Sequence, residues 1–353
     1  MSKSKRVVRL AILGTGRMAD YHAQRFQEVP NCQILAAVDV DRTRAEAFCK
    51  KHGIPTAYTN LDEVLARADI DAVSNVTPDA FHAPLSIRSL QAGKHVLCEK
   101  PLALNYPDAR RMVAVAKKSG LINMVNLSYR DWPCIQAVTA LVQRGALGEM
   151  RHVEASYLQS WLPSKIWGDW RTTPTWLWRL SSLHGSKGAL GDVGVHIIDF
   201  ATYPVGTISS VYCRLKAFRK APRDRVGEYV LDANDSAVLS IEFKNGALGT
   251  IHTTRWAGGH INRLYLKISG TKGSVEIDSE RTTDGYRIST GRDLDKGLWK
   301  DVKVGPVPNN YLRFVRSILT GKQDQPDFAR GAEIQKVLDA CFKSDEEQMP
   351  VRV

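Results

Sequence analysis

The sequence predicts a two-domain α/β protein whose first domain is built on a doubly wound parallel sheet. Its 353 residues exceed the usual length of a single hydrophobic core. Strand and helix patterns alternate regularly over the first third of the chain, which is typical of a parallel sheet covered by helices. We therefore expect a first domain over residues 1–124 and a second over residues 125–353.

The overall charge and hydropathy do not indicate a macromolecular partner. The formal net charge is +12, but the basic residues are spread along the chain except in one run, 214–225. We interpret this run as a solvated loop and expect no nucleic-acid partner. Residues 1–13 predict a first strand and not a signal peptide, because Arg9 interrupts the apolar run. No segment reaches the length of a membrane span, so no membrane partner is expected.

Cysteine usage indicates a reducing compartment. The six cysteines stand apart from one another and form no CxxC pair and no metal-like spacing. We predict free thiols, no bound metal and a cytoplasmic location.

The first functional motif follows the first strand. Residues 7–13 have the pattern of a buried strand, and GTGRMA then opens a helix, so GxGxxA lies at a strand-to-helix turn. In this setting Gly14 makes the turn and Gly16 lets the backbone approach a pyrophosphate, which the helix N-terminus would bind. The motif predicts a dinucleotide cofactor.

The second strand, 32–40, ends near Asp39, about twenty residues past the glycines, where a ribose-binding acid belongs. A carboxylate here can accept both ribose hydroxyls and would repel a 2′-phosphate, so NAD is favoured over NADP. Arg42 and Arg44 follow closely and could accommodate a phosphate, which keeps NADP as the alternative.

Further polar groups follow later strands of the alternation. Strands are expected near Ala57 and over 71–77, 94–100 and 121–127, and helices over 41–52, 60–68, 80–92 and 105–119. Ligands bind at the carboxyl edge of such sheets, where Thr77-Pro78 ends one strand. His82 lies a turn later and could bind a ligand, or it could cap or pack the helix.

Lys100 is the strongest candidate at a strand end. It stands between Glu99 and Pro101 at the carboxyl edge, where its ammonium would point into the crevice beside the nicotinamide. There it could hydrogen-bond a substrate hydroxyl or share in proton transfer, while an ordinary surface lysine in a turn is the alternative. The predicted cofactor contacts are Gly14, Gly16, Arg17, Met18, Asp39, Arg42, Thr77, Pro78, His82, Glu99 and Lys100.

The stretch GALGDVGVHIIDF, residues 188–200, places Asp192, His196 and Asp199 on one face of a predicted helix. A carboxylate and an imidazole one turn apart can hold, move and orient a proton. Asp192 and His196 are therefore candidate catalytic residues. Asp199 is expected to contact the pocket or to support the histidine.

A tryptophan-rich insertion precedes this helix and follows a predicted strand over 151–161. It contains Trp161, Trp167, Trp170, Trp176 and Trp178. Aromatic faces suit the C–H faces of sugar rings, although some of these rings must anchor the loop. Arg171, Arg179 and Lys187 lie among them and could bind an anionic substrate group or form salt bridges within the loop.

The rest of the chain predicts a sheet followed by helices. Strands are expected over 207–218, 236–243, 246–256, 263–269 and 273–278, with a hairpin turn at Asn245-Gly246. The last helices are expected over 309–320 and 330–343.

Motifs along nearly the whole chain occur in the order and spacing of one family: GTGRMA, AAVDVD, TPDAFH, AGKHVLCEKPLAL, NLSYR, GALGEM and GALGDVGVHIID. KGSVEID and the closing EIQKVLDACFKSDEEQMPVRV are also similar to the family's endings. The chain thus resembles the Gfo/Idh/MocA oxidoreductases. The resemblance implies an NAD-binding Rossmann domain and a C-terminal α+β domain with a large open, mainly antiparallel sheet, through which members commonly form homodimers or homotetramers.

The same resemblance implies a catalytic group. In inositol-dehydrogenase-like members it consists of the EKP lysine with the Asp and His of the DxGxH segment, positions filled here by Lys100, Asp192 and His196. The predicted substrate contacts are Lys100, Tyr129, Arg130, Trp167, Arg171, Trp176, Asp192 and His196.

These features predict hydride transfer between NAD and a secondary hydroxyl of a sugar, polyol or sugar acid. The alternative is an NAD-dependent glycoside hydrolase that cleaves a glycoside, possibly an anionic one, by transient oxidation, elimination, water addition and re-reduction. A non-catalytic NAD-dependent sensor is a third reading, and the intact Lys100, Asp192 and His196 set argues against it.

Overall fold

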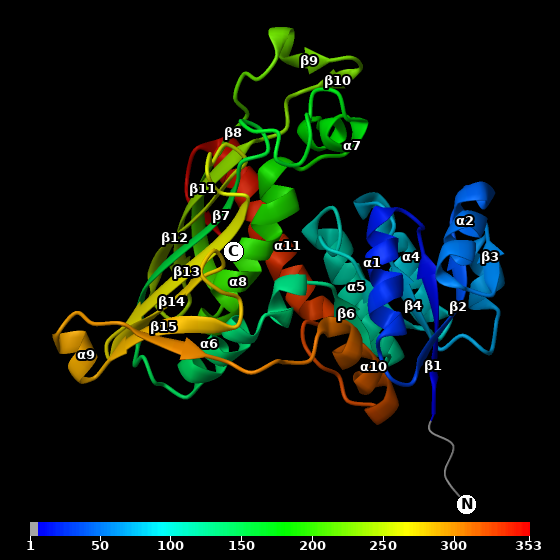
Figure 1. Ribbon diagram of the computed structural model, residues 1–353, viewed down its shortest axis with the longest axis horizontal. Coiled ribbons are helices and arrows are strands. Elements are labelled where there is room, and N and C mark those ends of the chain that lie inside the picture. The colour runs from blue at the N-terminus through cyan, green and yellow to red at the C-terminus, as the bar shows by residue number, and fades with distance from the viewer. Residues whose placement is uncertain (1–5) are drawn as a thin grey trace, which may run out of the picture. The chain divides into compact units, whose positions relative to one another are not determined.

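The computed structural model describes residues 6–353, which form two compact units (Figure 1). The first unit combines the described residues up to Ser128 with Pro308–Gln335, and the second combines Tyr129–Val307 with Lys336–Val353. Each unit therefore contains segments that are far apart in the sequence. Helix α10 (Asn310–Thr320) belongs to the first unit, and α11 (Phe328–Glu347) continues from the first into the second.

The first unit has a six-stranded parallel sheet in the order β3-β2-β1-β4-β5-β6, which confirms the predicted doubly wound fold. Its strands are β1 (Val8–Leu13), β2 (Cys32–Val38), β3 (Thr56–Tyr58), β4 (Ala72–Asn75), β5 (His95–Cys98) and β6 (Asn123–Val125). The strand order reverses between β1 and β4. Ligands of such sheets bind outside the carboxyl ends of the strands at this reversal.

Every helix predicted between these strands is present. They are α1 (Arg17–Gln27), α2 (Arg42–His52), α3 (Leu61–Leu65), α4 (His82–Gln91) after the 3₁₀ turn η1 (Asp79–Phe81), and α5 (Tyr106–Ser119). Asp41, Asn60 and Asn105 cap α2, α3 and α5 by accepting a backbone N–H. Helix α1 begins after Gly16 without a side-chain cap, so its N-terminal N–H groups face no side-chain acceptor of the described chain.

The second unit has a nine-stranded sheet in the order β16-β15-β14-β13-β7-β12-β11-β8-β17, which confirms the predicted mainly antiparallel architecture. Among the described strands of this second sheet, only β7 and β12 pair in parallel. The strands are β7 (Met150–Gln159), β8 (Ile208–Lys216), β11 (Ser236–Phe243), β12 (Leu248–Thr254), β13 (Asn262–Gly270), β14 (Gly273–Asp278), β15 (Gly285–Thr290), β16 (Lys300–Lys303) and β17 (Val351–Arg352). The predicted turn at Asn245-Gly246 joins β11 to β12, with Gly246 at φ +84°.

Helices cover one face of this sheet (Figure 1). They are α6 (Pro133–Gln143), after the 3₁₀ turn η2 (Ser128–Asp131), and α8 (Val195–Val205), after the π-helical turn η4 (Leu190–Gly194). The short helix α9 (Arg292–Asp295) connects β15 to β16. Strands β15, β16 and β17 are not among the predicted strands.

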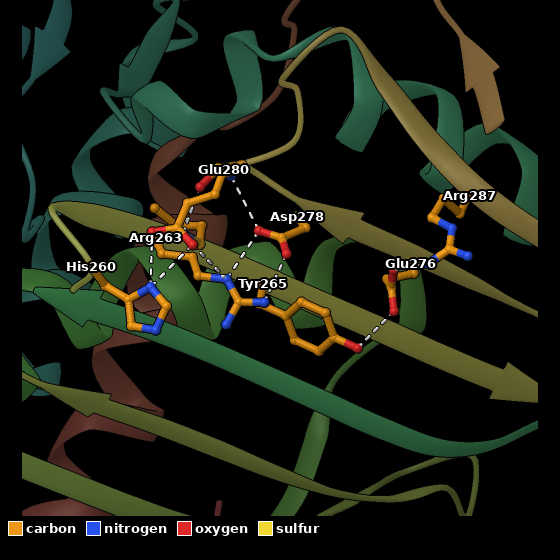
Figure 2. Close-up of polar contacts among 9 residues, drawn as sticks. His260, Arg263, Tyr265, Glu276, Asp278, Glu280 and Arg287 are labelled. Carbon is orange, nitrogen blue, oxygen red and sulfur yellow. Dashed lines mark hydrogen bonds and ion pairs between the residues drawn. The ribbon is translucent and has the colours of Figure 1, made fainter. Parts of the chain in front are cut away.

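The other face carries a polar network over β13, β14 and β15 (Figure 2). Arg263 donates Nε and Nη2 to the two carboxylate oxygens of Asp278, at 3.0 and 2.7 Å. Glu276 accepts from Tyr265 Oη at 3.0 Å and from Arg287 Nη1 at 3.1 Å. Charged side chains therefore occupy the face of these strands that the helices leave open.

The tryptophan-rich insertion and the basic run form one small cap at the end of the sheet marked by α7, β9 and β10 (Figure 1). The cap contains α7 (Pro174–Leu177), the 3₁₀ turns η3 (Trp178–Leu180) and η5 (Pro222–Asp224), and the hairpin of β9 (Arg225–Val226) with β10 (Tyr229–Val230). Trp161, Trp170 and Leu231 are buried at its centre.

The prediction of a fully solvated loop over 214–225 is wrong for Lys220. Its ammonium lies 2.9 Å from Asp235 Oδ2, and both side chains are inaccessible to solvent. The apolar residues around the run pack against the tryptophans of the insertion and carry this lysine inward. A sequence pattern of charges does not reveal such a partner, because Asp235 lies outside the run, just before the first residue of β11.

Candidate active site

Gly14 and Gly16, the two glycines of the first turn, are needed for different structural reasons. Gly14 has φ +87°, and a Cβ built on it would lie 2.8 Å from the carbonyl oxygen of Val76, at the end of the neighbouring strand. Gly16 has no atom within 4 Å of its Cβ position. Gly14 therefore allows the close approach of two strand ends, whereas Gly16 leaves open space at the N-terminus of α1, which fits a pyrophosphate.

This difference gives a paired prediction. Gly14→Ala should lower the free energy of unfolding by about 2–3 kcal/mol, because the new side chain meets a backbone oxygen in a left-handed conformation. Gly16→Ala should change it by less than about 0.5 kcal/mol, yet weaken NAD binding about tenfold or more. Urea unfolding followed by circular dichroism, with NAD titration calorimetry, measures both. An undiminished NAD affinity in Gly16→Ala would contradict the role assigned to this turn.

Asp39 is held in place as the predicted ribose-binding acid. Its carboxylate accepts the N–H and Oγ1 of Thr15 at 3.0 and 2.8 Å, the N–H of Asp41 at 3.0 Å and Arg44 Nη2 at 2.8 Å. Burial disfavours the charged carboxylate, but these hydrogen bonds outweigh it and lower the pKa of Asp39. The ionised carboxylate suits ribose hydroxyls. Arg42 pairs with Glu46 at 3.3 Å on the exposed side of α2.

His82 fixes two loops of the sheet edge to each other. Its Nδ1 lies 2.6 Å from the carbonyl oxygen of Pro101, and its Nε2 lies 2.9 Å from that of Thr77. The residue is 1% exposed. The sequence predicts that His82 either binds a ligand or packs the helix. The packing role explains the contacts of both ring nitrogens. The ring ties the turn after β4 to the turn that follows Lys100.

Glu99 points into the interior of the first unit. Its Oε1 lies 2.8 Å from His22 Nε2 and 2.7 Å from Asn126 Nδ2, and its Oε2 accepts the backbone N–H of Lys100 at 3.1 Å. Asn126 also donates to the hydroxyl of Tyr311 at 3.0 Å. Glu99 therefore anchors the backbone on which Lys100 stands, and its predicted contact with the cofactor stays a prediction.

Glu99 makes the stability of the first unit depend on pH. Burial disfavours its charge, but the hydrogen bonds from His22 and Asn126 outweigh burial and hold its pKa at about 2, below the ordinary 4.5. A carboxyl group whose pKa is lowered by folding stabilises the folded state at pH values above its pKa in the unfolded chain. For Glu99 this stabilisation is lost as the pH falls from about 4.5 to 2. Between pH 7 and pH 2 the wild type should lose about 3 kcal/mol more unfolding free energy than Glu99→Gln. Equal losses in urea titrations would contradict this.

Lys100 follows β5 at the carboxyl edge and is half-buried. Cys98, the last residue of β5, pairs with Asn75, the last residue of β4, and Asn75 in turn pairs with Leu13 at the end of β1. The lysine therefore stands two strands from the glycine turn, along the edge where the cofactor domain binds its ligand.

The helix predicted over 188–200 is present, but it is not regular throughout. Leu190–Gly194 form a π-helical turn, and α8 begins only at Val195. Gly191 permits this wide turn, because a Cβ on it would lie 2.3 Å from the Cβ of Lys187. A π-helical turn interrupts the regular rotation of about 100° per residue on which the prediction of a shared helix face is based.

Asp192 is bound by two arginines. Its Oδ2 accepts Arg255 Nη2 at 3.1 Å and lies 3.7 Å from Arg179 Nε. The Arg255 side chain is inaccessible to solvent, and its Nη1 donates to the carbonyl oxygen of Arg179 at 3.0 Å. Burial lowers the pKa of Arg255. Sequence reasoning missed Arg255, because an arginine just after a strand carries no pattern that identifies its partner.

Asp199 has a structural role in the described geometry. It accepts both Nε and Nη2 of Arg130, at 2.8 and 2.7 Å, and both side chains are almost fully buried. The Arg130 guanidinium also lies 3.8 Å from the centre of the Tyr203 ring. The pair ties the start of the second unit to α8. A direct substrate contact by Arg130 stays a prediction.

His196, in the first turn of α8, lies among aromatic side chains. The Tyr129 ring meets it edge-on with ring centres 4.8 Å apart, and the Tyr157 ring lies 6.4 Å away. The two tyrosine hydroxyls hydrogen-bond each other, and Asn262 Nδ2 donates to Tyr129 at 3.3 Å. Burial raises the pKa of Tyr157 well above its ordinary value. These tyrosines therefore fix the imidazole by packing.

Some tryptophans of the insertion are buried in the cap, and others are only partly buried. Trp161 and Trp170 are buried in the cap, with their indole N–H groups bound to Gln159 and to the carbonyl of Leu162. Trp167 and Trp176 are only partly buried and stack with ring centres 5.7 Å apart. Of the predicted substrate contacts in the insertion, these two rings retain accessible surface. Arg171 is exposed and lies over Trp170 at 4.5 Å.

Between them, the two units carry the groups that a dinucleotide-dependent oxidoreductase requires: an open glycine turn and Asp39 in the first, and Asp192 with His196 in the second. Over residues 6–353 no group of three or more metal-binding side chains is found. Residues 8–127 match the family model of oxidoreductases with an NAD-binding Rossmann fold, and residues 135–276 match the GFO/IDH/MocA C-terminal domain. The chain belongs to the Gfo/Idh/MocA family, as predicted, and its cofactor is NAD.

The chain is also similar to individual proteins over almost its full length. Levoglucosan dehydrogenase of Pseudarthrobacter phenanthrenivorans is 27% identical over 380 residues, with 95% of each chain covered. A solved levoglucosan dehydrogenase in complex with NADH and levoglucosan matches with a TM-score of 0.86 at 25% identity, over 99% of each chain. An oxidoreductase domain protein from Kribbella flavida matches with a TM-score of 0.87 at 30% identity, also over 99% of each chain.

Proposed function

We propose that this protein is an NAD-dependent dehydrogenase that oxidises a secondary hydroxyl of a sugar, polyol or sugar acid. The observation that carries the proposal is the intact set of Lys100, Asp192 and His196 in a chain whose first unit is an NAD-binding domain. A solved relative that holds NADH and levoglucosan supports a carbohydrate substrate.

The residues of the first unit fit the cofactor. Gly16 and the uncapped N-terminus of α1, with Arg17 and Met18 exposed there, would hold the pyrophosphate. Asp39 would accept the ribose hydroxyls, and Thr77 would face the cofactor from the next strand end. When bound, NAD supplies the hydride acceptor.

The residues of the chain then handle the proton and the oxygen of the reacting hydroxyl. His196 takes the hydroxyl proton as a general base. The Lys100 ammonium donates a hydrogen bond to the same oxygen and stabilises the charge that develops on it. Asp192, fixed by Arg255, orients these groups toward the substrate. No step in this assignment requires a group that the chain and NAD do not provide.

The direct test is a panel of neutral sugars, polyols, sugar acids and nitrophenyl glycosides incubated with NAD. We expect at least one free sugar, polyol or acid to yield NADH in proportion to the ketone formed. Release of nitrophenol without accumulation of NADH would instead identify the redox-assisted glycosidase. A panel in which no member reacts by either route would contradict both catalytic functions.

A homo-oligomer and a cytoplasmic location belong to the same proposal. The sheet face opposite the helices exposes Val238 on β11 and Leu248 on β12 at 58% each, and it also carries the polar network on β13, β14 and β15. This mixed surface favours a homodimer or homotetramer, and light scattering measures the mass. All six cysteines are free, which suits a reducing compartment. No helix within residues 6–353 has the length and apolar character needed to cross a membrane.

A further inference from the structure

The cap of the second unit carries more positive charge around Asp192 than this carboxylate can neutralise. Arg255 and Arg179 both approach Asp192 Oδ2, so two guanidinium groups share one carboxylate. Asp235, the next acid near Arg255, is already paired with the buried Lys220. Two guanidinium charges therefore face one carboxylate at a place only partly open to water, where an incompletely neutralised charge is costly.

The excess charge is located on Arg179. Arg255 is inaccessible to solvent and makes the hydrogen bond to Asp192, whereas the Arg179 side chain is 27% exposed and its Nε is 3.7 Å from that oxygen, beyond hydrogen-bond distance. Among the hydrogen bonds of residues 6–353, the Arg179 guanidinium donates Nη1 to the carbonyl of Thr175. Nε and Nη2 remain as donors for a ligand.

The position of Arg179 is fixed by its surroundings. Its carbonyl oxygen accepts Arg255 Nη1 at 3.0 Å and Ser186 Oγ at 2.6 Å. Its guanidinium lies 5.2 Å from the centre of the Trp176 ring and 4.6 Å from that of Trp178. The single guanidinium group of Arg255 thus binds both the backbone of Arg179 and the carboxylate of Asp192. This bridge sets the distance between the backbone of Arg179 and Asp192.

We propose that Arg179 binds the carboxylate of an acidic sugar, so that the substrate of this dehydrogenase is a sugar acid rather than a neutral sugar. The carboxylate neutralises the excess charge and accepts Nε and Nη2 of Arg179 in a charge-assisted, two-pronged pair. Trp178, which is 38% exposed beside the Arg179 guanidinium, provides apolar surface for the sugar ring. This inference rests on the proposed function, because it takes Asp192 as part of the reacting site.

The test compares D-glucuronate and D-galacturonate with their uncharged amides in wild type, Arg179→Met and Arg225→Met. Arg225 is an exposed arginine on β9 of the same cap, so its loss changes the charge of the cap equally. In the wild type we expect kcat/KM for an acid to exceed that for its amide by about 10- to 100-fold. In Arg179→Met this ratio should fall to about 1, and in Arg225→Met it should stay within about threefold of the wild-type ratio.

Calorimetric titration of the NADH complex with the same acids and amides gives a binding readout without turnover. In the wild type the Kd of an acid should be about 10- to 100-fold lower than that of its amide, and in Arg179→Met the two values should be about equal. Equal values for acid and amide in the wild type, or a wild-type ratio retained in Arg179→Met, would overturn the inference. Oxidation of neutral sugars but not of acids would overturn it while leaving the proposed function intact. If no sugar of either kind reduces NAD, the proposed function fails, and the calorimetric ratios still decide whether Arg179 binds a carboxylate.

Discussion

Replacing Lys100 with methionine is expected to lower kcat for sugar oxidation by about 10³-fold. The substitution removes the ammonium that donates to the reacting oxygen and leaves a side chain of similar length, and charge stabilisation of this kind contributes factors of about 10² to 10³. The side chain is half-buried at the carboxyl edge of the sheet, so the loss of its charge should not unfold the unit. Lys100→Arg keeps the charge on a longer, planar group and should recover little of the rate.

Initial rates at saturating NAD and substrate measure this effect, and the KM values show where it acts. A loss confined to KM for NAD, with kcat within about threefold of wild type, would show that Lys100 binds the cofactor and takes no part in the reaction. His196→Gln supplies the companion measurement. A general base contributes about 10²- to 10⁴-fold, so this variant should also lose kcat, and the loss should be smallest at high pH, where hydroxide can take the proton.

Replacing Asp199 with alanine is expected to lower the free energy of unfolding of the second unit by about 3–5 kcal/mol. The change leaves Arg130 buried with its Nε and Nη2 deprived of their carboxylate, and an uncompensated buried charge carries a penalty of this size. Arg130→Met should have a comparable effect, because it leaves the buried Asp199 without its arginine.

The double variant Arg130→Met with Asp199→Leu separates pairing from packing. It replaces the ion pair with apolar side chains, so it should be less destabilised than the sum of the single variants by about 2 kcal/mol or more. All eight tryptophans lie between Trp132 and Trp299, within the second unit, so tryptophan fluorescence in urea follows this unit alone. Additive losses in the double variant would show that the two residues do not act as a pair.

The first unit was largely predictable because its local signals agree with its fold. Each short apolar strand is followed by a helix, and Asp41, Asn60 and Asn105 are side chains that favour helix starts. The glycine turn could be placed from its strand-to-helix setting. What the pattern could not show is that Gly14 is needed for the backbone of Val76 as well as for the cofactor turn, since that contact joins segments 62 residues apart.

The second unit departs from prediction where side chains meet across long sequence separations. The regular helix expected around Asp192 is a π-helical turn, because Gly191 allows close packing on Lys187 that periodicity does not encode. Arg255, the partner of Asp192, lies 63 residues away at the end of a different element. Strand β15 also escaped prediction, because its residues do not alternate strictly between buried and partly exposed positions.

The most direct test of the proposed dehydrogenase uses a reactive sugar deuterated at every carbon. The proposed reaction predicts that NADH accumulates and carries one deuterium for each molecule of ketone formed, as mass spectrometry of both products can measure. If the deuterated glycoside instead releases its aglycone, keeps the deuterium of the transiently oxidised carbon and accumulates no NADH, the protein is not a dehydrogenase, and the roles assigned to Lys100, Asp192 and His196 in net oxidation are wrong.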